Sequence, residues 1–284
     1  MKKNSLPKFI LLVIAIVVAV ASQAQSLHAD SINPYKVVVR SSQHGISLLN
    51  NLDTYLSGYN HTGTGYTFTH ETLRKAHFGS YDFKYQTLLH ATLGYTNLHD
   101  NNQYSLMAGR RWSGYHPFRV NDRLELLAGA QVLLSGGALY VPTNGNNLVS
   151  LKMHLAVAGT AMAIYHLPLA RNHCTLRYQI DIPLAGLLFS PEFGQSYYEI
   201  FGLEDYGGTL RFSHPVNTPS WRHTLSADIP IGNSTIRVSY VADLYQTKVN
   251  NLRTHLYNHS FSVGFVRTIY KVKRNDPLDA YNPF

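Results

Sequence analysis

Alternation of apolar and polar residues with a period of two restricts the fold of this chain more than any other feature. In the segment 174–184 every second residue, from Cys174 to Leu184, is apolar, and polar residues lie between them. The same alternation returns in the segments 221–229, 236–244 and 257–269. Because successive side chains of a β-strand point to opposite faces, each segment predicts a strand with one apolar face.

Further segments carry the pattern with more interruptions, and turn residues separate them: 58–73, 83–95, 104–112, 124–134, 149–161 and 208–213. We therefore count ten candidate strands, and the stretch 35–42 is a possible addition. Alternating segments of roughly ten residues are typical of transmembrane barrels, whose strand numbers in bacteria are even. The predicted fold is all-β, a single antiparallel transmembrane β-barrel of about ten strands, with twelve as the alternative.

A soluble β-sandwich or lipocalin-like barrel would show the same alternation, with the apolar faces turned inward. Aromatic residues near the ends of the predicted strands favour the membrane, where such residues lie at the headgroup level; they are Tyr95, Trp112, Tyr165, Trp221 and Tyr270. After residue 24, no segment approaches 18 consecutive apolar residues, so we expect no transmembrane helix.

The start of the chain is predicted to be an export signal. Lys2 and Lys3 precede an apolar run at 9–20, and Ser22-Gln23-Ala24 is a small–x–small cleavage site. An uncleaved anchor helix is the alternative, although the run is short for a span of about 20 residues. We expect cleavage near Ala24 and delivery to the outer membrane.

The predicted organisation has four parts: the signal peptide 1–24, an N-terminal periplasmic segment 25–50, the barrel 51–272 and a tail 273–284. The single cysteine, Cys174, rules out an intramolecular disulfide framework. The formal net charge is +8, but the basic residues are scattered, so we expect no nucleic-acid partner.

Charged residues gather on the face that would turn inward in a membrane barrel. The predicted lumen charge lattice consists of Arg177, Asp181, Arg211, Arg222, Asp228, Arg237 and Asp243. Small barrels fill their interiors with side chains, so these charges are expected to be paired and to stiffen the wall. The alternative is an ion- or substrate-selective constriction. A connection that could contact a ligand or plug the lumen contains Pro191, Phe193, Gly194, Gln195, Tyr197 and Tyr198.

Some outer-membrane barrels are enzymes, so Ser, His and acidic residues that lie close together are candidate catalytic residues. Ser213-His214 lies near a strand end, and His223 and Asp228 lie on the next strand. His223 and Asp228 have opposite parity and would face opposite sides, which argues against a Ser/His/acid site. Zinc-ligand, phosphate-loop and nucleophile-elbow spacings do not occur in the sequence. We expect no enzyme, no metal and no cofactor.

The chain resembles Gram-negative outer-membrane β-barrel proteins, and residues 135–265 resemble an uncharacterised family of such barrels. Three motifs carry the resemblance: Ser135-Gly136-Gly137-Ala138-Leu139-Tyr140, Asn144-Gly145-Asn146-Asn147 and the stretch from Ser190 to Phe201. The resemblance implies a location and a fold, and no established activity. It also implies outer-membrane lipid and the outer-membrane assembly machinery as partners.

One departure from that class concerns the last strand, whose final residue is commonly aromatic. Pro277 and Pro283 interrupt any strand before Phe284, so the recognition strand is expected at 260–270. Counting back from a periplasmic end places the long connection 190–207 in the periplasm, where connections are normally short. The alternatives are a strand count that is off by one there and a segment that folds into the lumen as a plug. We expect a structural or ligand-interacting barrel; the alternatives are a small solute pore and a membrane-embedded hydrolase.

Overall fold

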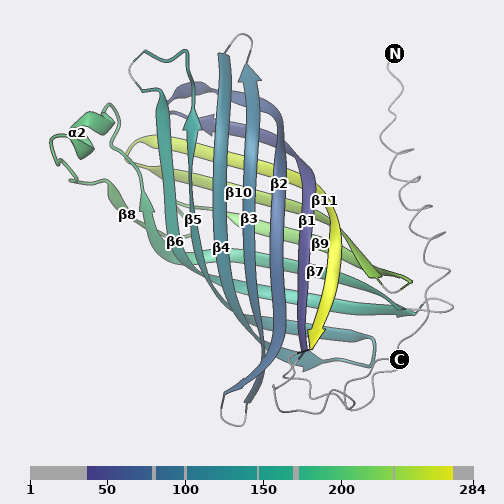
Figure 1. Cartoon of the computed structure of the whole chain (residues 1–284). Helices are drawn as coiled ribbons and strands as arrows, with labels where there is room; N and C mark the ends of the chain where they lie inside the picture. Colours follow the sequence, from purple (N-terminus) through teal and green to yellow (C-terminus); the bar gives the residue numbers. More distant parts are fainter. Residues whose placement is uncertain are drawn as a thin grey trace, which may run out of the picture.

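The computed structural model describes residues 37–78, 81–98, 101–145, 147–168, 173–232 and 234–270. They form a closed antiparallel β-barrel (Figure 1). The strands are β1 (Val37–Asp53), β2 (Ser57–Phe78), β3 (Tyr81–Leu98), β4 (Asn101–Arg119), β5 (Leu124–Tyr140), β6 (Val149–Pro168), β7 (His173–Phe189), β8 (Leu210–Ser213), β9 (Trp221–Ile231), β10 (Ser234–Val249) and β11 (Leu252–Tyr270), and the short helix α2 covers Tyr197–Phe201.

Strands that follow one another in sequence pair, except β8 and β9, and β1 pairs with β11 to close the ring. The strands β8 and β9 share one position, because both pair with β7 and both run in the same direction along it. The eleven strands therefore occupy ten positions, which confirms the predicted ten-stranded barrel. In a closed ring every strand has a neighbour on both sides, so the barrel has no free edge strand.

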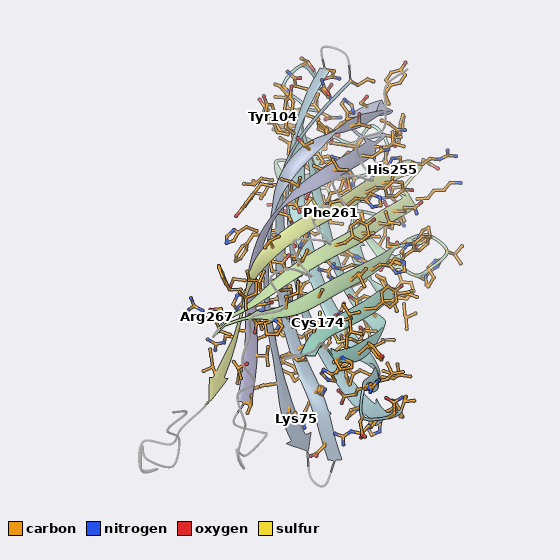
Figure 2. All side chains as sticks on the ribbon, turned by 90° about the vertical axis from the view of Figure 1, so that its right-hand side faces the viewer. Lys75, Tyr104, Cys174, His255, Phe261 and Arg267 are labelled. Atoms are coloured by element: carbon orange, nitrogen blue, oxygen red, sulfur yellow. The ribbon has the colours of Figure 1, made fainter. Side chains whose placement is uncertain are left out.

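The polarity of the wall is the reverse of that in a soluble protein. Inward positions are mostly polar and buried, as on β1, where Ser41, Gln43 and Ser47 are almost inaccessible. Outward positions are apolar and exposed, and Figure 2 shows side chains such as Tyr104 and Phe261 on the barrel. The soluble alternative, with apolar residues packed inward, is therefore wrong, and the barrel has the surface of a transmembrane β-barrel.

The outward apolar surface extends around the ring. Its members include Ile46, Leu48, Leu89, Leu93, Leu106, Val132, Leu134, Leu155, Val157, Ile182, Leu184, Leu225, Phe261, Val263 and Phe265. Tyr95, Tyr104 and Tyr140 form a row of neighbouring rings across β3, β4 and β5. Aromatic side chains in such a row suit the boundary between lipid and water. Among the described residues, no helix is both long and apolar enough to cross a membrane.

The barrel starts earlier than the sequence indicated. Val37–Asp53 is a full strand of the ring, so the expected periplasmic segment 25–50 is wrong from Val37 onward, as is the start of the barrel at residue 51. The period-2 pattern of this strand is masked by polar residues on its outward face, such as His44 and Asn50. The expected signal peptide 1–24 and the tail 273–284 lie outside the described residues.

The strand count also decides the position of the long connection. The segments 208–213 and 221–229 were counted as two strands, but they occupy one position, and β1 supplies the tenth. Consequently the connection 190–209 lies at the end of the barrel opposite to Val37 and Tyr270 (Figure 1). The expectation that it shares the side of the chain ends is wrong. We call the end with Val37 and Tyr270 the terminal end, and the opposite end the loop end.

Candidate functional site in the barrel lumen

Three ion pairs cross the lumen and join strands that lie opposite one another in the ring. Glu71 on β2 binds Arg177 on β7 at 2.5 Å, Asp53 on β1 binds Lys152 on β6 at 2.8 Å, and Arg111 on β4 binds Asp243 on β10 at 3.2 Å. In each pair the two strands are five positions apart in the ring of ten. We call these the cross-lumen pairs. They connect the wall across its full width at three levels.

Glu71 is the centre of the largest of these networks. Its carboxylate accepts two hydrogen bonds from Arg177, one from Arg237 and one from Gln86. Arg237 also binds Asp228, with its Nε at 2.5 Å from Oδ1 and its Nη2 at 2.7 Å from Oδ2. Two guanidinium groups face two carboxylates, so the charges balance in a space from which water is largely excluded.

Neutral side chains fill the lumen around this network. The Gln86 amide donates to Gln179 at 3.0 Å, and the Tyr115 hydroxyl donates to Gln86 at 2.8 Å. Tyr115 also packs in a buried apolar cluster with Leu127, Met162 and Ile164. A cavity beside Glu71 has a volume of about 20 Å³, which is close to the size of one water molecule. This half of the lumen is packed with side chains.

A second network lies nearer to the loop end. Arg222 on β9 and Arg111 both bind the carboxylate of Asp243. Asp181, the cross-strand partner of Arg222, accepts hydrogen bonds from Thr160 at 2.5 Å and from Gln179 at 2.9 Å. With Asp181 included, two arginines and two carboxylates again balance, so the group is neutral overall.

The structure brings six of the seven residues of the predicted charge lattice into the lumen: Arg177, Asp181, Arg222, Asp228, Arg237 and Asp243. Arg211 is not among them. It lies at the rim on β8, where its side chain is 43% exposed and binds Glu192 and Asn250. Parity along one strand predicts which face a side chain occupies, but it does not predict how far along the barrel the lumen extends.

Charged residues of the lumen that were not predicted as lattice members include Asp53, Glu71, Arg111 and Lys152. Glu71 and Lys152 lie on predicted strands, on the polar face, so parity alone could have found them. Asp53 could not be found in this way, because its strand was not assigned to the barrel. Arg111 follows Arg110 in sequence, and only the burial of Arg111 distinguishes the two.

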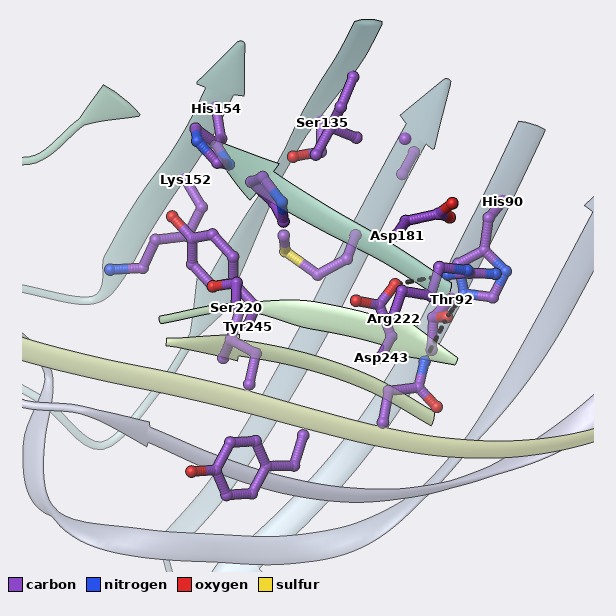
Figure 3. A pocket seen from close by; sticks show the side chains of 18 of the residues that line it. His90, Thr92, Ser135, Lys152, His154, Asp181, Ser220, Arg222, Asp243 and Tyr245 are labelled. Carbon is purple, nitrogen blue, oxygen red and sulfur yellow. Dashed lines mark hydrogen bonds and ion pairs between the residues drawn. The ribbon is translucent and has the colours of Figure 1, made fainter. Parts of the chain in front are cut away.

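A cavity of about 110 Å³ lies between the second network and the loop end (Figure 3). Its floor includes His90, Arg111, Arg222 and Asp243. Apolar side chains complete most of the remaining surface: Leu49, Met107, Leu133, Leu139, Ala158 and Leu256. Figure 3 shows Lys152 and His154 on one side of the cavity and His90 and Arg222 on the other. The lining is thus polar at the floor and largely apolar above it.

The loop end is closed by a cluster of buried residues that we call the mouth cluster: Tyr55, Leu56, Leu139, Val141, Leu252 and Leu256, with Met107, Tyr197 and Tyr245 packed against it. Tyr197 comes from α2 in the long connection, and its hydroxyl accepts a hydrogen bond from the backbone N–H of Leu151 at 2.6 Å. Burial raises the pKa of Tyr197 to about 12, so the phenol stays neutral at physiological pH.

The predicted loop residues therefore have different roles. Tyr197 reaches the mouth cluster, and the carbonyl oxygen of Gln195 accepts a hydrogen bond from the Tyr55 hydroxyl at 3.0 Å. Phe193 and Tyr198 are each 71% exposed, and Pro191 is buried. Gly194 has a φ of 84°, a conformation that favours glycine. The connection covers the loop end and does not descend into the lumen as a plug.

Replacing Tyr197 with alanine is expected to release this connection while the barrel stays folded. The change removes a buried ring and the acceptor of the Leu151 N–H, and a local loss of about 2 kcal/mol raises the opened fraction about 30-fold. Limited proteolysis within residues 190–209 should accelerate accordingly, because cleavage follows the opened population. The matched variant Tyr198→Ala changes an exposed ring and should be cleaved at the wild-type rate; equal acceleration would contradict the role of Tyr197.

The residues considered for a hydrolase are separated in the structure. The Ser213 hydroxyl lies 3.0 Å from His154 Nε2, not beside His214, and His223 binds the outward Tyr178 hydroxyl. His154 Nδ1 is buried and has no hydrogen-bond partner among the described residues, so a carboxylate that would orient it is missing there. Within the same residues, no group of three His, Cys, Asp or Glu side chains could hold a metal ion.

Comparisons with known proteins place the chain in a family. A family model described as "Protein of unknown function (DUF3316)" matches residues 9–276, in agreement with the resemblance to an uncharacterised family. A search of curated proteins found no match.

Solved structures similar to this chain include the translocator domain of the autotransporter NalP from Neisseria meningitidis, with a TM-score of 0.41 and 12% identity over 95% of this chain and 98% of that one. An outer membrane channel from Pseudomonas putida F1 gives a TM-score of 0.39 and 10% identity, with coverages of 85% and 100%. Ail, the attachment invasion locus protein of Yersinia pestis, gives 0.28 and 10%, with coverages of 81% and 98%.

Proposed function

Since the chain belongs to the DUF3316 family, whose description assigns no activity, we propose from its lumen that it is a non-conducting outer-membrane barrel with a structural or ligand-interacting role. The apolar outward surface supports residence in a membrane, and a closed barrel is the form in which strands cross one. The export signal expected at 1–24 supports the outer membrane as the destination.

The observation that carries the proposal is the set of cross-lumen pairs. Each pair fixes side chains across the full width of the lumen, and the side chains of Glu71, Gln86, Tyr115 and Arg237 are almost completely buried. An open pore requires a continuous file of water, whereas these groups bind one another. The mouth cluster adds a second obstruction at the loop end.

The pore alternative makes the opposite prediction for an electrical measurement. Purified protein that has been inserted into a planar lipid bilayer is expected to show no discrete conductance steps. Heat-modifiability on a detergent gel of a washed outer-membrane fraction provides the control, because a folded barrel changes mobility only after boiling. Regular conductance steps from a heat-modifiable sample would contradict a closed lumen.

The proposal extends to orientation and partners. The terminal end would face the periplasm, where the connections 120–123 and 232–233 are short, as is usual on that side. The longer connections 141–148 and 190–209 would face outward. Outer-membrane lipid would cover the wall, and the assembly machinery would recognise β11, the last strand. We propose no nucleic-acid partner and no catalytic activity.

A further inference from the structure

The cavity above the second network is blocked in both directions along the barrel axis. Leu139, Leu256, Met107 and Tyr245 belong to or pack on the mouth cluster and also line the cavity, so they form its roof. Below the floor, the lumen is filled by the network around Glu71. A molecule that occupies the cavity would therefore need a route through the wall.

The wall beside the cavity is interrupted. The β7–β9 pairing ends at Asp181 and Arg222, and the β7–β8 pairing begins only at Gly186 and Ser213. Four residues of β7, 182–185, thus face the eight residues 214–221 with no strand pairing between them. The strand β7 also contains Pro183, which has no N–H to donate, and its register with β6 shifts at this level. We call the segment 214–220 the wall break.

Few bonds attach the wall break to the next strand. The pairing of β9 with β10 ends at Trp221 and Leu244. Beyond it, the Ser220 hydroxyl accepts from the N–H of Gln246 at 2.9 Å and lies 3.1 Å from its carbonyl oxygen, and the carbonyl oxygen of Asn217 accepts from the N–H of Lys248 at 2.8 Å. Ser220, Trp221 and Pro183 also line the cavity, so the wall break separates the cavity from the outside.

The outer surface at the wall break is apolar. Leu184, Leu187, Phe212 and Trp221 all point outward and are exposed there. These side chains continue the apolar surface of the barrel, so the medium outside the break is membrane lipid if the proposed function holds. A molecule dissolved in that lipid could reach the cavity without entering water.

The lining of the cavity indicates the class of ligand. Arg111 and Arg222 are balanced by Asp243 and Asp181, and Lys152 is balanced by Asp53, so the floor does not select a charged group. Polar side chains at the floor can bind one hydroxyl or carbonyl group, and Leu49, Met107 and Leu133 can contact an apolar body. A dry cavity of about 150 Å³ holds benzene, so a volume of about 110 Å³ suits one small ring or a short chain.

We propose that this cavity binds a small, uncharged, membrane-soluble molecule with one hydrogen-bonding group, and that the molecule enters from the lipid through the wall break. The inference rests on the proposed function, because closed ends leave the wall as the route. The cavity would then bind a defined class of ligand, in a lumen whose side chains would otherwise have only a structural role.

Fluorine NMR of 4-fluorobenzyl alcohol, added to the full barrel in lipid nanodiscs, tests the site. We expect a bound resonance that is distinct from that of the lipid-dissolved probe and missing from empty nanodiscs. Ala158→Leu fills the cavity from β6 and should weaken binding at least about tenfold. Ser135→Leu, from β5, provides a second filling variant, and Ala161→Leu, on the lipid face of β6, is the matched control.

Exchange of the probe tests the route. Ser220→Ala removes the side-chain hydrogen bonds to Gln246, so exchange between bound and lipid-dissolved probe should become about tenfold faster. Ser226→Ala changes a buried serine of β9, away from the break, and should leave the rate unchanged.

Each outcome decides a different part of the inference. The absence of a bound resonance from heat-modifiable wild-type protein, or equal loss in Ala161→Leu, would overturn the site. An unchanged rate in Ser220→Ala would overturn the route. Conductance steps in a planar bilayer would instead contradict the proposed function, so the two failures are distinguishable.

Discussion

Replacing Glu71 with alanine is expected to lower the free energy of unfolding by about 3 to 5 kcal/mol, the cost of breaking a buried ion pair by removing one partner. Arg177 loses its carboxylate partner, whereas Arg237 keeps Asp228. An unpaired guanidinium in a packed lumen cannot recover its lost hydration, so the folded state loses stability. Urea titration, with the heat-modifiable band as the measure of folded protein, should show the shift.

Two further variants separate the effect of charge from that of volume. Adding Arg177→Met to Glu71→Ala removes the unpaired cation and should restore about half of the loss. Glu192→Ala breaks the rim pair with Arg211, in which both side chains are largely exposed, and should cost less than about 1 kcal/mol. If Glu71→Ala cost no more than Glu192→Ala, the network around Glu71 would not stabilise the barrel.

A single methyl group at Gly264 is expected to disturb the seam that closes the ring. A Cβ built on Gly264 would lie 1.9 Å from the carbonyl oxygen of Ser42 on β1, a distance that requires the backbone to move. A Cβ built on Gly45, on the other side of the same seam, would lie 2.1 Å from the carbonyl oxygen of Phe261. Gly264→Ala should therefore cost about 3 kcal/mol through overpacking and reduce the heat-modifiable fraction in a washed outer-membrane sample.

Gly114→Ala is the matched control for this seam. A Cβ at Gly114 would have no atom within 4 Å, although this glycine also lies inside a strand, β4. The control should keep the wild-type urea midpoint or raise it slightly, because alanine restricts the unfolded chain more than glycine does. Equal loss of folded protein in both variants would show that the close approach of the two backbones at the seam is not the reason for a glycine at position 264.

The period-2 alternation was sufficient to predict most of the strands and most of the side chains that face the lumen. Arg177, Arg222 and Arg237 were predicted to share one face because residues of like parity point the same way along a strand. The alternation could not say whether that face turned inward or outward, since a soluble barrel and a membrane barrel satisfy the same period. Closure of the ring with the apolar face outside decided this.

The predicted number of strands is correct because two differences between the predicted and the observed strands cancel. The stretch at 35–42 was only a possible strand, and 208–213 was counted separately from 221–229. Neither could be settled locally, because a break within one strand and a turn between two strands have similar sequences. Pairing of β8 and β9 with the same strand, β7, settles the count and moves the long connection to the loop end.

By itself, then, the sequence determined most of the strands, the polar face of each well-patterned strand and the absence of a disulfide framework. The tertiary structure decided which charges meet. Glu71 and Arg177 are separated by 106 residues in the chain, and they bind because ring closure places β2 opposite β7. The cavity and the wall break depend in the same way on register between strands, which local alternation does not encode because every two-residue shift preserves the pattern.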